Sequence, residues 1–597
     1  MRLPMQRNSA LHRAMRRGGV PETSEFRRIR DLPRRDWEND LYDGFTVVEI
    51  AEYLTDSLQR PGGKMRLRPV QAKTLQEAHD YGGVFAPIPV GNGKTLITFL
   101  LPSVMDSQRP LLVVPAKLRD KTYREFAVLL QHWHPHPALE VCSYEALSRT
   151  GGTDLLMELS PDLIILDEAH RVKNLSAAVT RKLNQYIGAR LPKVCAMSGT
   201  LIKRSLLDFN HILRWCLPAG LVPLPDTEAE LALWASAVDE IKQSEQRTAT
   251  PPAQLIELSG DAKALIESGQ RENLSMRNVA RRAVRERFLA TPGIISARCP
   301  LEIEASLDLH LTLVDGYNDR TEELADVVAQ GIKPNGDIIE EDDLSASWRI
   351  MRTLTSGFWY DYKIPPPPDW LAARKDWRRI VRHYLDGHHA GMESPLLVAN
   401  RAAQGRLRPA ENAAYSEWVA VRDTFQPESI AIWEDDRLIE YVQKWAKRNK
   451  GLIWVSEVAL GDRLSSVIGI PYYRQMGKNA AGDPIELAEP KNGPIICSIA
   501  SNSEGRNLQH WDTNLVISPP PTGLVWEQLL GRTHRHGQAS DSVTVEVAIG
   551  CAVEWECFRQ AQRDAQLASA IENPKKLEAA TVTTFEPPFA SNPLWRI

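Results

Sequence analysis

The sequence contains little cysteine and no long apolar run. Its seven cysteines, in 597 residues, are scattered and never form a CxxC pair. Zinc modules and disulfide frameworks need regularly spaced cysteines, so both are excluded and a reducing compartment is expected. No apolar run approaches the ~18 residues that a membrane-spanning helix needs. The arginine-rich first residues also lack the apolar core of a secretory signal, so we expect a soluble, intracellular protein.

The sequence also lacks a strong net charge. Its 72 Lys and Arg residues nearly balance 76 Asp and Glu residues, which gives a formal charge of -4. Without a global positive field, any surface that binds nucleic acid must be local. The arginine-rich range 1–36 is such a candidate, although a solvated end is the favoured interpretation. The length corresponds to roughly four average domains.

The most informative stretch is LIILDEAHRVKN, residues 163–174. Four apolar residues run directly into Asp167 and Glu168. This pattern predicts a buried parallel strand, and ligands in open α/β sheets bind at the carboxyl ends of such strands. Asp167 can hold Mg²⁺, and Glu168 can orient a water molecule and accept its proton. The alternative is a strand followed by a solvated acidic turn.

A glycine-containing stretch upstream predicts a phosphate-binding loop. A strand from Gly83 runs into VGNGKTLITFLL, in which Gly91 and Gly93 allow the backbone to curl closely around phosphate. Lys94 supplies a positive charge, Thr95 a hydroxyl for Mg²⁺, and the following helix directs its N-terminal dipole at the anion. The match to G-x-x-x-x-G-K-[ST] is incomplete, because Ile88 stands at the first glycine position.

Further short apolar runs alternate with helical patterns and predict a doubly wound parallel sheet. In the first part of the chain they lie at 111–115, 139–144, 163–166 and 194–200. In the last part they lie at 451–456, 470–474, 494–500, 514–518 and 541–549, and predict a second parallel sheet. The intervening range lacks this rhythm, and we expect a largely helical insertion there. Core packing is favoured over base stacking for its tryptophans: Trp348, Trp359, Trp370, Trp377 and Trp418.

The second sheet brings its own charged stretch, QLLGRTHRHGQ, at 528–538. Gln528, Arg532 and Arg535 are spaced i, i+4 and i+7, which places them on one face of a helix. Guanidinium groups are planar, permanently charged forks that suit phosphate oxygens as charge develops. A surface helix with salt bridges is the alternative, but it does not account for so many like charges packed together.

Two further signals are weaker. Gln71, in MRLRPVQAKTL, follows a rigid Arg68-Pro69 turn, and its amide offers a donor and an acceptor in one plane, which suits an adenine edge. Ser198 and Thr200 lie at the end of the last strand of the first set and could relay contacts to a second lobe, or could simply be a polar strand end.

Together these stretches resemble the motifs of superfamily 2 helicases and translocases, and within them the Swi/Snf-like ATPases. LRPVQ resembles the adenine-reading segment, VGNGKT motif I, VVPAKL motif Ia, DEAH motif II and MSGT motif III. SNSEGRNLQ resembles motif V, and QLLGRTHRHGQ resembles motif VI, whose GRxHRxGQ ending is the most specific feature. The departures are IPVGNGKT in place of DEMGLGKT and Leu201 in place of a proline. The absence of targeting modules favours a compact phage or bacterial type.

The resemblance implies an α/β fold of two RecA-like parallel-sheet lobes separated by a large, mainly helical insertion. The expected boundaries are a basic N-terminal extension at 1–63, the first lobe at 64–215, the insertion at 216–429, the second lobe at 430–570 and a tail at 571–597.

The resemblance also implies residue roles. The catalytic group is Lys94, Asp167, Glu168, Gln528, Arg532 and Arg535. The group expected to bind ATP is Gln71, Gly91, Asn92, Gly93, Lys94, Thr95, Leu96 and Gly505. Mg²⁺ would be held by Thr95 and Asp167. The group expected to couple hydrolysis to a nucleic-acid track is His170, Ser198, Gly199, Thr200 and Asn507.

The implied function is that of an ATP-dependent helicase or translocase on double-stranded DNA. We expect a monomer in the cytoplasm of a bacterial or phage-infected cell. Two alternatives remain at this point. One is an ATP-gated protein that recruits a replication or repair partner without travelling along DNA. The other is an RNA helicase of the DEAH type.

Overall fold

The fold is given by a computed structural model of the chain. It describes residues 19–88, 93–149, 151–175, 177–199, 205–239, 250–272, 274–296, 303, 305–339, 344–386, 392, 394–535, 537–571, 574–588 and 592–595. Among the residues predicted to act in the site, Gly91, Asn92 and Thr200 lie outside the described residues, as does the beginning of the arginine-rich range, 1–18.

The first sheet contains five described strands, all parallel, in the order β1-β5-β4-β2-β3. Their bounds are β1 Gly83–Ala86, β2 Pro110–Val114, β3 Glu140–Ser143, β4 Leu163–Asp167 and β5 Lys193–Met197. The central strand β4 is apolar and fully buried from Leu163 to Leu166 and ends at Asp167. All strands predicted for this part of the chain are confirmed.

Helices cover both faces of this sheet. Alternate residues of β4 therefore pack in two different cores. Ile164 and Leu166 pack in one core, and Leu163 and Ile165 pack in the other. The helices are α2 Ser24–Arg30, α3 Val47–Leu58, α4 Pro69–Tyr81, α5 Lys94–Val104, α6 Arg119–Leu129, α7 Tyr144–Ser148, α8 Gly152–Leu159, α9 Ala178–Arg190, α10 Asn210–Cys216, α11 Glu228–Val238, α12 Ala262–Arg271 and α13 Met276–Leu289. The 3-10 turns are η1 Ala116–Leu118, η2 Ala169–Val172, η3 Leu206–Asp208, η4 Ala219–Leu221 and η6 Ala253–Leu258. We call the described residues of 19–296 the first lobe.

The second sheet has seven described strands in the order β10-β11-β9-β12-β13-β6-β14, all parallel. Their bounds are β6 Ser306–Leu313, β9 Leu452–Val455, β10 Tyr472–Tyr473, β11 Ile495–Ser498, β12 Thr513–Ile517, β13 Ser542–Ile549 and β14 Thr581–Thr583. The five strands predicted for this sheet are confirmed. We call the described residues of 305–362 and 429–595 the second lobe.

Two strands of this sheet lie outside the expected lobe boundaries of 430 and 570. Strand β6 comes from the range predicted as a helical insertion, and β14 comes from the predicted tail. The sequence of β6, SLDLHLTL, alternates apolar and polar residues, so only one side of the strand is well buried. The alternating segment 541–549 was predicted as a strand, but β6 was missed because its range was assigned to the helical insertion.

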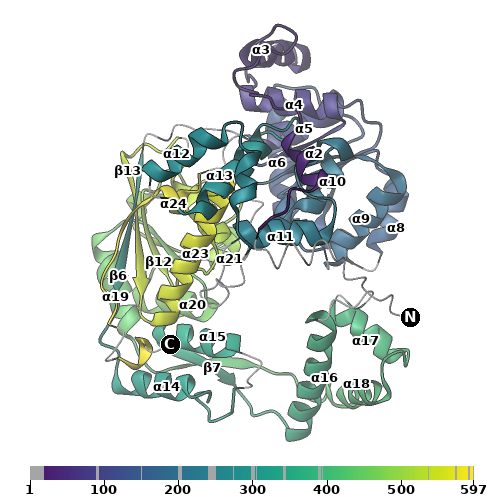
Figure 1. The fold of residues 1–597 in the computed structure, drawn as a ribbon. Coiled ribbons are helices and arrows are strands. Elements are labelled where there is room, and N and C mark those ends of the chain that lie inside the picture. Colours follow the sequence, from purple (N-terminus) through teal and green to yellow (C-terminus); the bar gives the residue numbers. More distant parts are fainter. Residues whose placement is uncertain are drawn as a thin grey trace.

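Helices of the second lobe pack around this sheet (Figure 1). They are α14 Asp319–Ala329, α15 Leu344–Thr355, α19 Arg437–Arg448, α20 Val458–Ile468, α21 Ile499–Asn502, α22 Gly523–Thr533, α23 Ala552–Ile571 and α24 Lys576–Ala579. The 3-10 turns are η7 Gln475–Gly477, η8 Ile485–Leu487, η9 Pro490–Asn492 and η10 Pro593–Trp595. The long helix α23 also contacts α13 of the first lobe, and its Leu567 is buried in a first-lobe core.

The range 216–429 is not one insertion. Its first helices, α11 to α13, pack in the core of the first lobe, and β6, α14 and α15 belong to the second. Only α16 Pro368–Asp386, α17 Pro395–Ala403 and α18 Pro409–Val421 form a separate three-helix unit with a small core of its own. An antiparallel ribbon of β7 Phe358–Tyr362 and β8 Ser429–Trp433 joins this unit to the second lobe. Figure 1 shows it extending away from the second sheet.

Three of the five tryptophans named for this range are buried, and Trp418 is half-buried against the small core of the three-helix unit. Trp359, Trp370 and Trp377 are buried, whereas Trp348 is 42% exposed. Trp377 packs inside the three-helix unit and Trp359 inside the second lobe.

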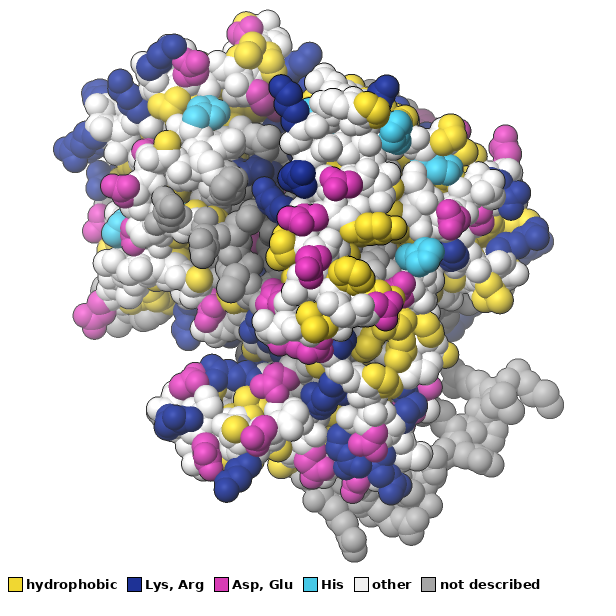
Figure 2. Space-filling model, turned by 90° about the horizontal axis from the view of Figure 1, so that it is seen from above, with side chains coloured by type: hydrophobic (Ala, Val, Ile, Leu, Met, Phe, Trp, Pro, Cys, Tyr) yellow, Lys and Arg dark blue, Asp and Glu magenta, His cyan; other side chains and the backbone are white. Residues whose placement is uncertain are grey.

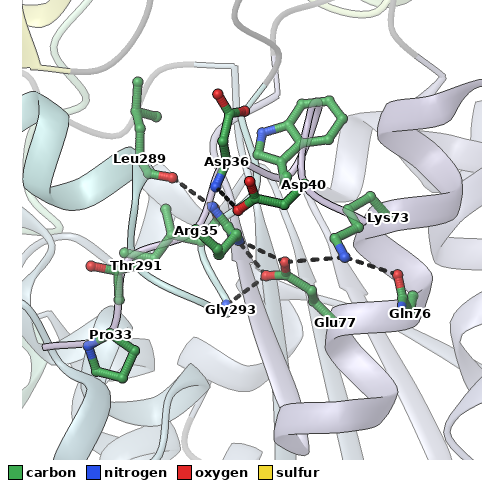
Figure 3. A network of polar contacts seen from close by, with 12 residues as sticks. Pro33, Arg35, Asp36, Asp40, Lys73, Gln76, Glu77, Leu289, Thr291 and Gly293 are labelled. Atoms are coloured by element: carbon green, nitrogen blue, oxygen red, sulfur yellow. Dashed lines mark hydrogen bonds and ion pairs between the residues drawn. The ribbon is translucent and has the colours of Figure 1, made fainter. Parts of the chain in front are cut away.

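The described part of the arginine-rich range, residues 19–36, packs in the first lobe. Arg35 makes a two-pronged ion pair with the Glu77 carboxylate, both distances being 2.8 Å, and donates to the Leu289 and Ile294 carbonyls (Figure 3). Glu77 also accepts from the backbone N–H of Gly293 at 2.6 Å. Because Glu77 lies on α4, this network connects the N-terminal segment to the helix that precedes β1. It also connects that segment to the residues after α13.

The face of the molecule drawn in Figure 2 shows no field of one sign. In Figure 2, basic and acidic side chains intermingle over the face seen from above, in line with the small net charge. None of the described helices is long and apolar enough to cross a membrane.

Candidate functional site

Two adjacent carboxylates lie at the carboxyl end of the central strand β4. Asp167 is the last residue of the strand, and Glu168 follows with a left-handed φ of 55°. Such a backbone conformation is unfavourable for a residue with a side chain and is concentrated at functional sites. It turns the chain sharply into η2. One Glu168 oxygen lies 3.7 Å from Lys94 Nζ, and the other lies 3.3 Å from His170 Nδ1.

The two carboxylates have different protonation behaviour. Burial raises the pKa of Asp167 to about 7, with a further contribution from the negative charge of Glu168. Burial also acts to raise the pKa of Glu168, but Lys94 and His170 outweigh it and hold that pKa well below its usual range. The charged form is therefore favoured at Glu168, whereas burial favours the protonated form of Asp167. Paired carboxyl groups with divergent pKa values are typical of reactive sites.

The start of α5 faces these carboxylates. Gly93 precedes the helix with a φ of 74°, and a Cβ at this position would lie 2.2 Å from Gln71 Nε2. Gln71 donates to the Gly93 carbonyl at 3.2 Å and accepts from the Arg68 backbone N–H at 2.9 Å. Its amide thus supports the turn into α5. Glycine is required at position 93 both by the backbone conformation and by this close approach.

The hydroxyl of Thr95, the second residue of α5, is also in use. It donates to the Glu125 carboxylate on α6 at 2.9 Å. Thr95 and Asp167 offer hydroxyl and carboxylate oxygens, which hard divalent cations prefer. The described residues contain no group of three or more His, Cys, Asp or Glu side chains that could hold a metal ion. Any cation here would therefore need oxygen ligands from a bound molecule or water.

Helix α22 of the second lobe presents the opposite half of the site. Gln528 and Arg532 are buried on this helix, and Arg532 donates to the Gln528 carbonyl at 2.8 Å and to the Arg506 carbonyl at 2.9 Å. The helix ends at Thr533, so the prediction that Arg535 shares its face is wrong. Arg535 lies in the following turn and donates to Asn507 Oδ1 at 2.6 Å.

A cavity of about 230 Å³ brings the two halves together. The first lobe lines it with Gly93, Lys94, Thr95, Leu118, Lys121, Thr122, Glu125, Asp167, Glu168 and Gly199. The second lobe lines it with Glu504, Gly505, Asn507, Leu524, Glu527, Gln528, Arg532 and Arg535. Burial lowers the pKa of Arg532 to about 10, helped by the like charge of Arg535 and opposed by Glu168. The buried Arg532 and the half-buried Arg535 thus face two carboxylates across one small polar cavity, which suits a compact polyanion.

A second cavity of about 450 Å³ adjoins the first and shares Gly93, Thr95 and Glu125 with it. It is lined further by Met65, Arg66, Arg68, Gln71, Leu96, Val128 and Leu129. Its mix of apolar side chains, an amide and guanidinium groups suits a flat, polar ring. The predicted residues Gln71 and Leu96 therefore lie beside this cavity and not in the first one.

The predicted coupling residues connect the acidic turn to its surroundings. His170 Nδ1 lies 3.1 Å from the Ser198 hydroxyl, which links η2 to the end of β5. The Gly199 carbonyl accepts from Lys575 Nζ of the second lobe at 3.1 Å. Asn507 holds Arg535, as described above. Except for the residues outside the described ranges, every residue predicted for the site lines one of the two cavities or contacts a residue that does.

Several cavity residues were not predicted. Lys121, Thr122 and Glu125 lie on α6, whose sequence has no recognisable motif. Glu504 and Glu527 fall inside or beside stretches that were recognised, so their position was a usable signal. Two larger cavities, of about 800 and 600 Å³, lie along α13. In the smaller of these two, the Arg277 and Arg281 guanidinium groups already donate to backbone carbonyls.

Comparison with known proteins adds no relative. No protein-family model and no curated protein sequence matches this chain. A functional assignment therefore depends on the geometry of the two cavities and on the sequence motifs that line them.

Proposed function

We propose that this protein is an ATP hydrolase whose active site is the cavity between the two lobes, and that it uses hydrolysis to move along double-stranded DNA. The observation that carries the proposal is the meeting, in one cavity, of Lys94 and the carboxylate pair with Gln528, Arg532 and Arg535. A triphosphate in this cavity would face the N-terminus of α5, where backbone N–H groups and the helix dipole favour anions. The adenine ring would occupy the adjoining cavity beside Gln71.

The carboxylates have separate roles in this proposal. Glu168 orients a water molecule and accepts its proton. In the absence of substrate it is held ionised by Lys94. When Lys94 turns to the phosphate oxygens, the Glu168 carboxylate loses that stabilisation and becomes a stronger base. Thr95 and Asp167 fit Mg²⁺ with hard oxygen ligands, and the ion would neutralise charge on the phosphate oxygens.

The arginines of the second lobe act on the leaving phosphate. Arg532 and Arg535 would stabilise negative charge as it develops there, a contribution on the order of 10³- to 10⁵-fold in comparable sites. Since they come from a different lobe than the carboxylates, the catalytic set is complete only when the lobes are together. Hydrolysis would then alternate with opening, and this alternation would drive stepwise motion along a track.

The proposed track is the DNA phosphate backbone. Support comes from the resemblance of the 528–538 stretch, including its GRxHRxGQ ending, to motif VI of Swi/Snf-like ATPases. The intermingled surface charges imply that binding depends on local groups of Lys and Arg. Because those groups would release counterions from phosphate, affinity for DNA should fall steeply as salt rises.

The three-helix unit favours a second candidate function. It has its own core and is joined to the second lobe by a ribbon, so it is a self-contained surface for a partner. In this alternative, ATP-driven closure recruits or releases a replication or repair protein without travel along DNA.

The test compares ATP hydrolysis with single-stranded DNA, double-stranded DNA and RNA side by side, together with displacement of a triplex-forming strand. Strongest stimulation by duplex DNA, with displacement, supports the translocase. Stimulation by DNA without displacement favours the ATP-gated interaction protein, and strongest stimulation by RNA favours an RNA helicase. No hydrolysis under any condition would overturn all three.

A further inference from the structure

Beside the proposed active site, one carboxylate of the second lobe bridges two cations of the first. Glu504, in the loop between α21 and β12, lies 2.5 Å from Lys117 Nζ. The same carboxylate accepts from Arg171 Nη2 at 3.0 and 3.2 Å. Lys117 belongs to η1, and Arg171 belongs to η2, directly after His170.

The environment of Glu504 makes this contact stronger than an ordinary surface ion pair. Its side chain is only 15% exposed, against 33% for Arg171 and 40% for Lys117. Burial acts to raise the pKa of Glu504, but Lys117 and Arg171 more than offset it and hold that pKa below its usual range. Exposed pairs contribute little, whereas a partly buried carboxylate loses much when its partners leave. Both partners are in the other lobe, so separation of the lobes would leave the Glu504 charge without them.

The next residue, Gly505, lies against side chains of the first lobe. Gly505 has a φ of 73°, and a Cβ at this position would lie 2.5 Å from Leu118 Cδ2. Leu118 follows Lys117 in η1, so the ion pair and the close approach form one continuous contact. A larger residue at 505 would have to displace the Leu118 side chain and would also be strained by the positive φ.

The same loop also holds both arginines of the proposed active site. Arg532 donates to the Arg506 carbonyl, and Arg535 donates to the Asn507 side chain. The short loop of residues 504–507 thus contacts the first lobe through Glu504. It accepts hydrogen bonds from the guanidinium groups of Arg532 and Arg535 through its last two residues. On the first-lobe side, Arg171 is adjacent to His170, which contacts Glu168.

We propose that Glu504 is a positioning residue that latches the second lobe onto the first and thereby sets Arg532 and Arg535 opposite Asp167 and Glu168. Glu504 takes no direct part in the chemistry. It acts through its contacts with Lys117 and Arg171 and through the 504–507 loop. The latch follows from the contacts alone, whereas its effect on turnover rests on the proposed ATP hydrolysis.

The first experiment measures the distance between the lobes without any nucleotide. Spin labels are attached to Leu191→Cys in the first lobe and Leu487→Cys in the second, both of which are exposed, at 82% and 70%. The six described cysteines are buried and should label poorly. With Glu504→Gln, the ratio of closed to open molecules should fall on the order of tenfold, which is an ordinary size for coupling between sites.

The control variant is Glu556→Gln. Glu556 forms an ion pair with Arg563 inside α23, and its side chain is 30% exposed, so the substitution removes a partly buried charge whose partner lies in the same helix. Its distance distribution should match that of the parent protein. If Glu504→Gln also leaves the distribution unchanged, the latch is overturned, whatever the enzymatic activity.

The second experiment measures ATP hydrolysis in a double-mutant cycle. Glu504→Gln and Arg171→Gln should each lower kcat on the order of tenfold, and KM should change little because most of the binding contacts are in the first lobe. The double variant should be no worse than Glu504→Gln alone, because that substitution already removes the contact with Arg171. Fully additive losses would contradict the latch. If the parent protein hydrolyses no ATP, the proposed function fails while the distance measurement still decides the latch.

Discussion

Lys94 and Glu168 form an ion pair across the start of the proposed active site, with 3.7 Å between Nζ and Oε1. One residue opens α5 and the other follows β4, so the pair links the predicted phosphate loop to the predicted acidic turn. Both groups are well shielded, with side-chain exposures of 11% and 21%. In the proposed function, a triphosphate competes with Glu168 for the Lys94 charge.

Replacing Lys94 should therefore weaken nucleotide binding. Lys94→Ala removes a hydrogen bond between charged groups, which is worth about 1.5–3 kcal/mol, so the Kd for ATP should rise roughly tenfold or more. Titration of a fluorescent ATP analogue measures this change. Lys491→Ala, at a lysine that is 76% exposed, is the control and should bind as the parent protein does. If the Lys94 variant binds ATP as tightly as the parent protein, Lys94 does not contribute to phosphate binding.

Replacing Glu168 should leave nucleotide binding intact and strongly slow ATP hydrolysis. Glu168→Gln keeps the shape of the side chain but cannot accept a proton, and general-base catalysis contributes roughly 10²- to 10⁴-fold. A loss of kcat in that range, with nucleotide affinity retained or increased, is expected from single-turnover measurements. Hydrolysis within a few fold of the parent rate would show that another group activates water.

The N-terminal segment should be needed for stability. Arg35→Ala leaves the Glu77 carboxylate, whose side chain is 4% exposed, without its main cationic partner. Removing one member of a buried ion pair costs about 3–5 kcal/mol, so the first lobe should unfold at clearly lower denaturant concentration. Arg30→Ala, whose partners Glu22 and Asp31 are exposed, should have little effect. Equal losses in both variants would contradict the network in Figure 3.

A buried carboxyl at the end of α11 should make stability depend on pH. Burial raises the pKa of Asp239 from 3.8 to about 7, although the Ser205 side chain and the Leu206 backbone N–H act in the opposite direction. A raised folded-state pKa means that the stabilisation is complete below the unfolded value and is lost as pH rises through the folded value. Relative to Asp239→Asn, the parent protein should lose thermal stability as pH rises from about 4 to about 7. Parallel curves for the two proteins would show that Asp239 ionises normally.

The sequence was most informative where one physical signal decided the outcome. Continuous apolar runs predicted the strands of both sheets, because a strand buried on both faces has no polar side. Gly93 and Lys94 marked the start of α5, because a helix that begins with glycine and lysine after a buried strand is a recognisable anion site. The meeting of this loop with the 528–535 stretch could be expected only from the family resemblance, and the structure places both at one cavity.

Other features depended on tertiary contacts that no local pattern contains. Strand β6 is an alternating segment that belongs to the second sheet only through its pairing with β13. Arg35 looks like a solvated charge in sequence, and only the fold supplies Glu77 as its partner. Glu125 and Lys121 reach the cavity because α6 lies across the start of α5, and their own sequence does not indicate this.

Arg535 gives the most direct test of a site shared between the lobes. The parent protein and Arg535→Ala are compared for ATP hydrolysis in saturating duplex DNA, with Arg474→Ala, whose ion pair with Asp462 is exposed and lies within the second lobe, as the control. We expect the Arg535 variant to lose on the order of 10³-fold in kcat while still binding ATP, and the control to retain its rate. An Arg535→Ala protein that hydrolyses ATP as fast as the parent would contradict the shared site.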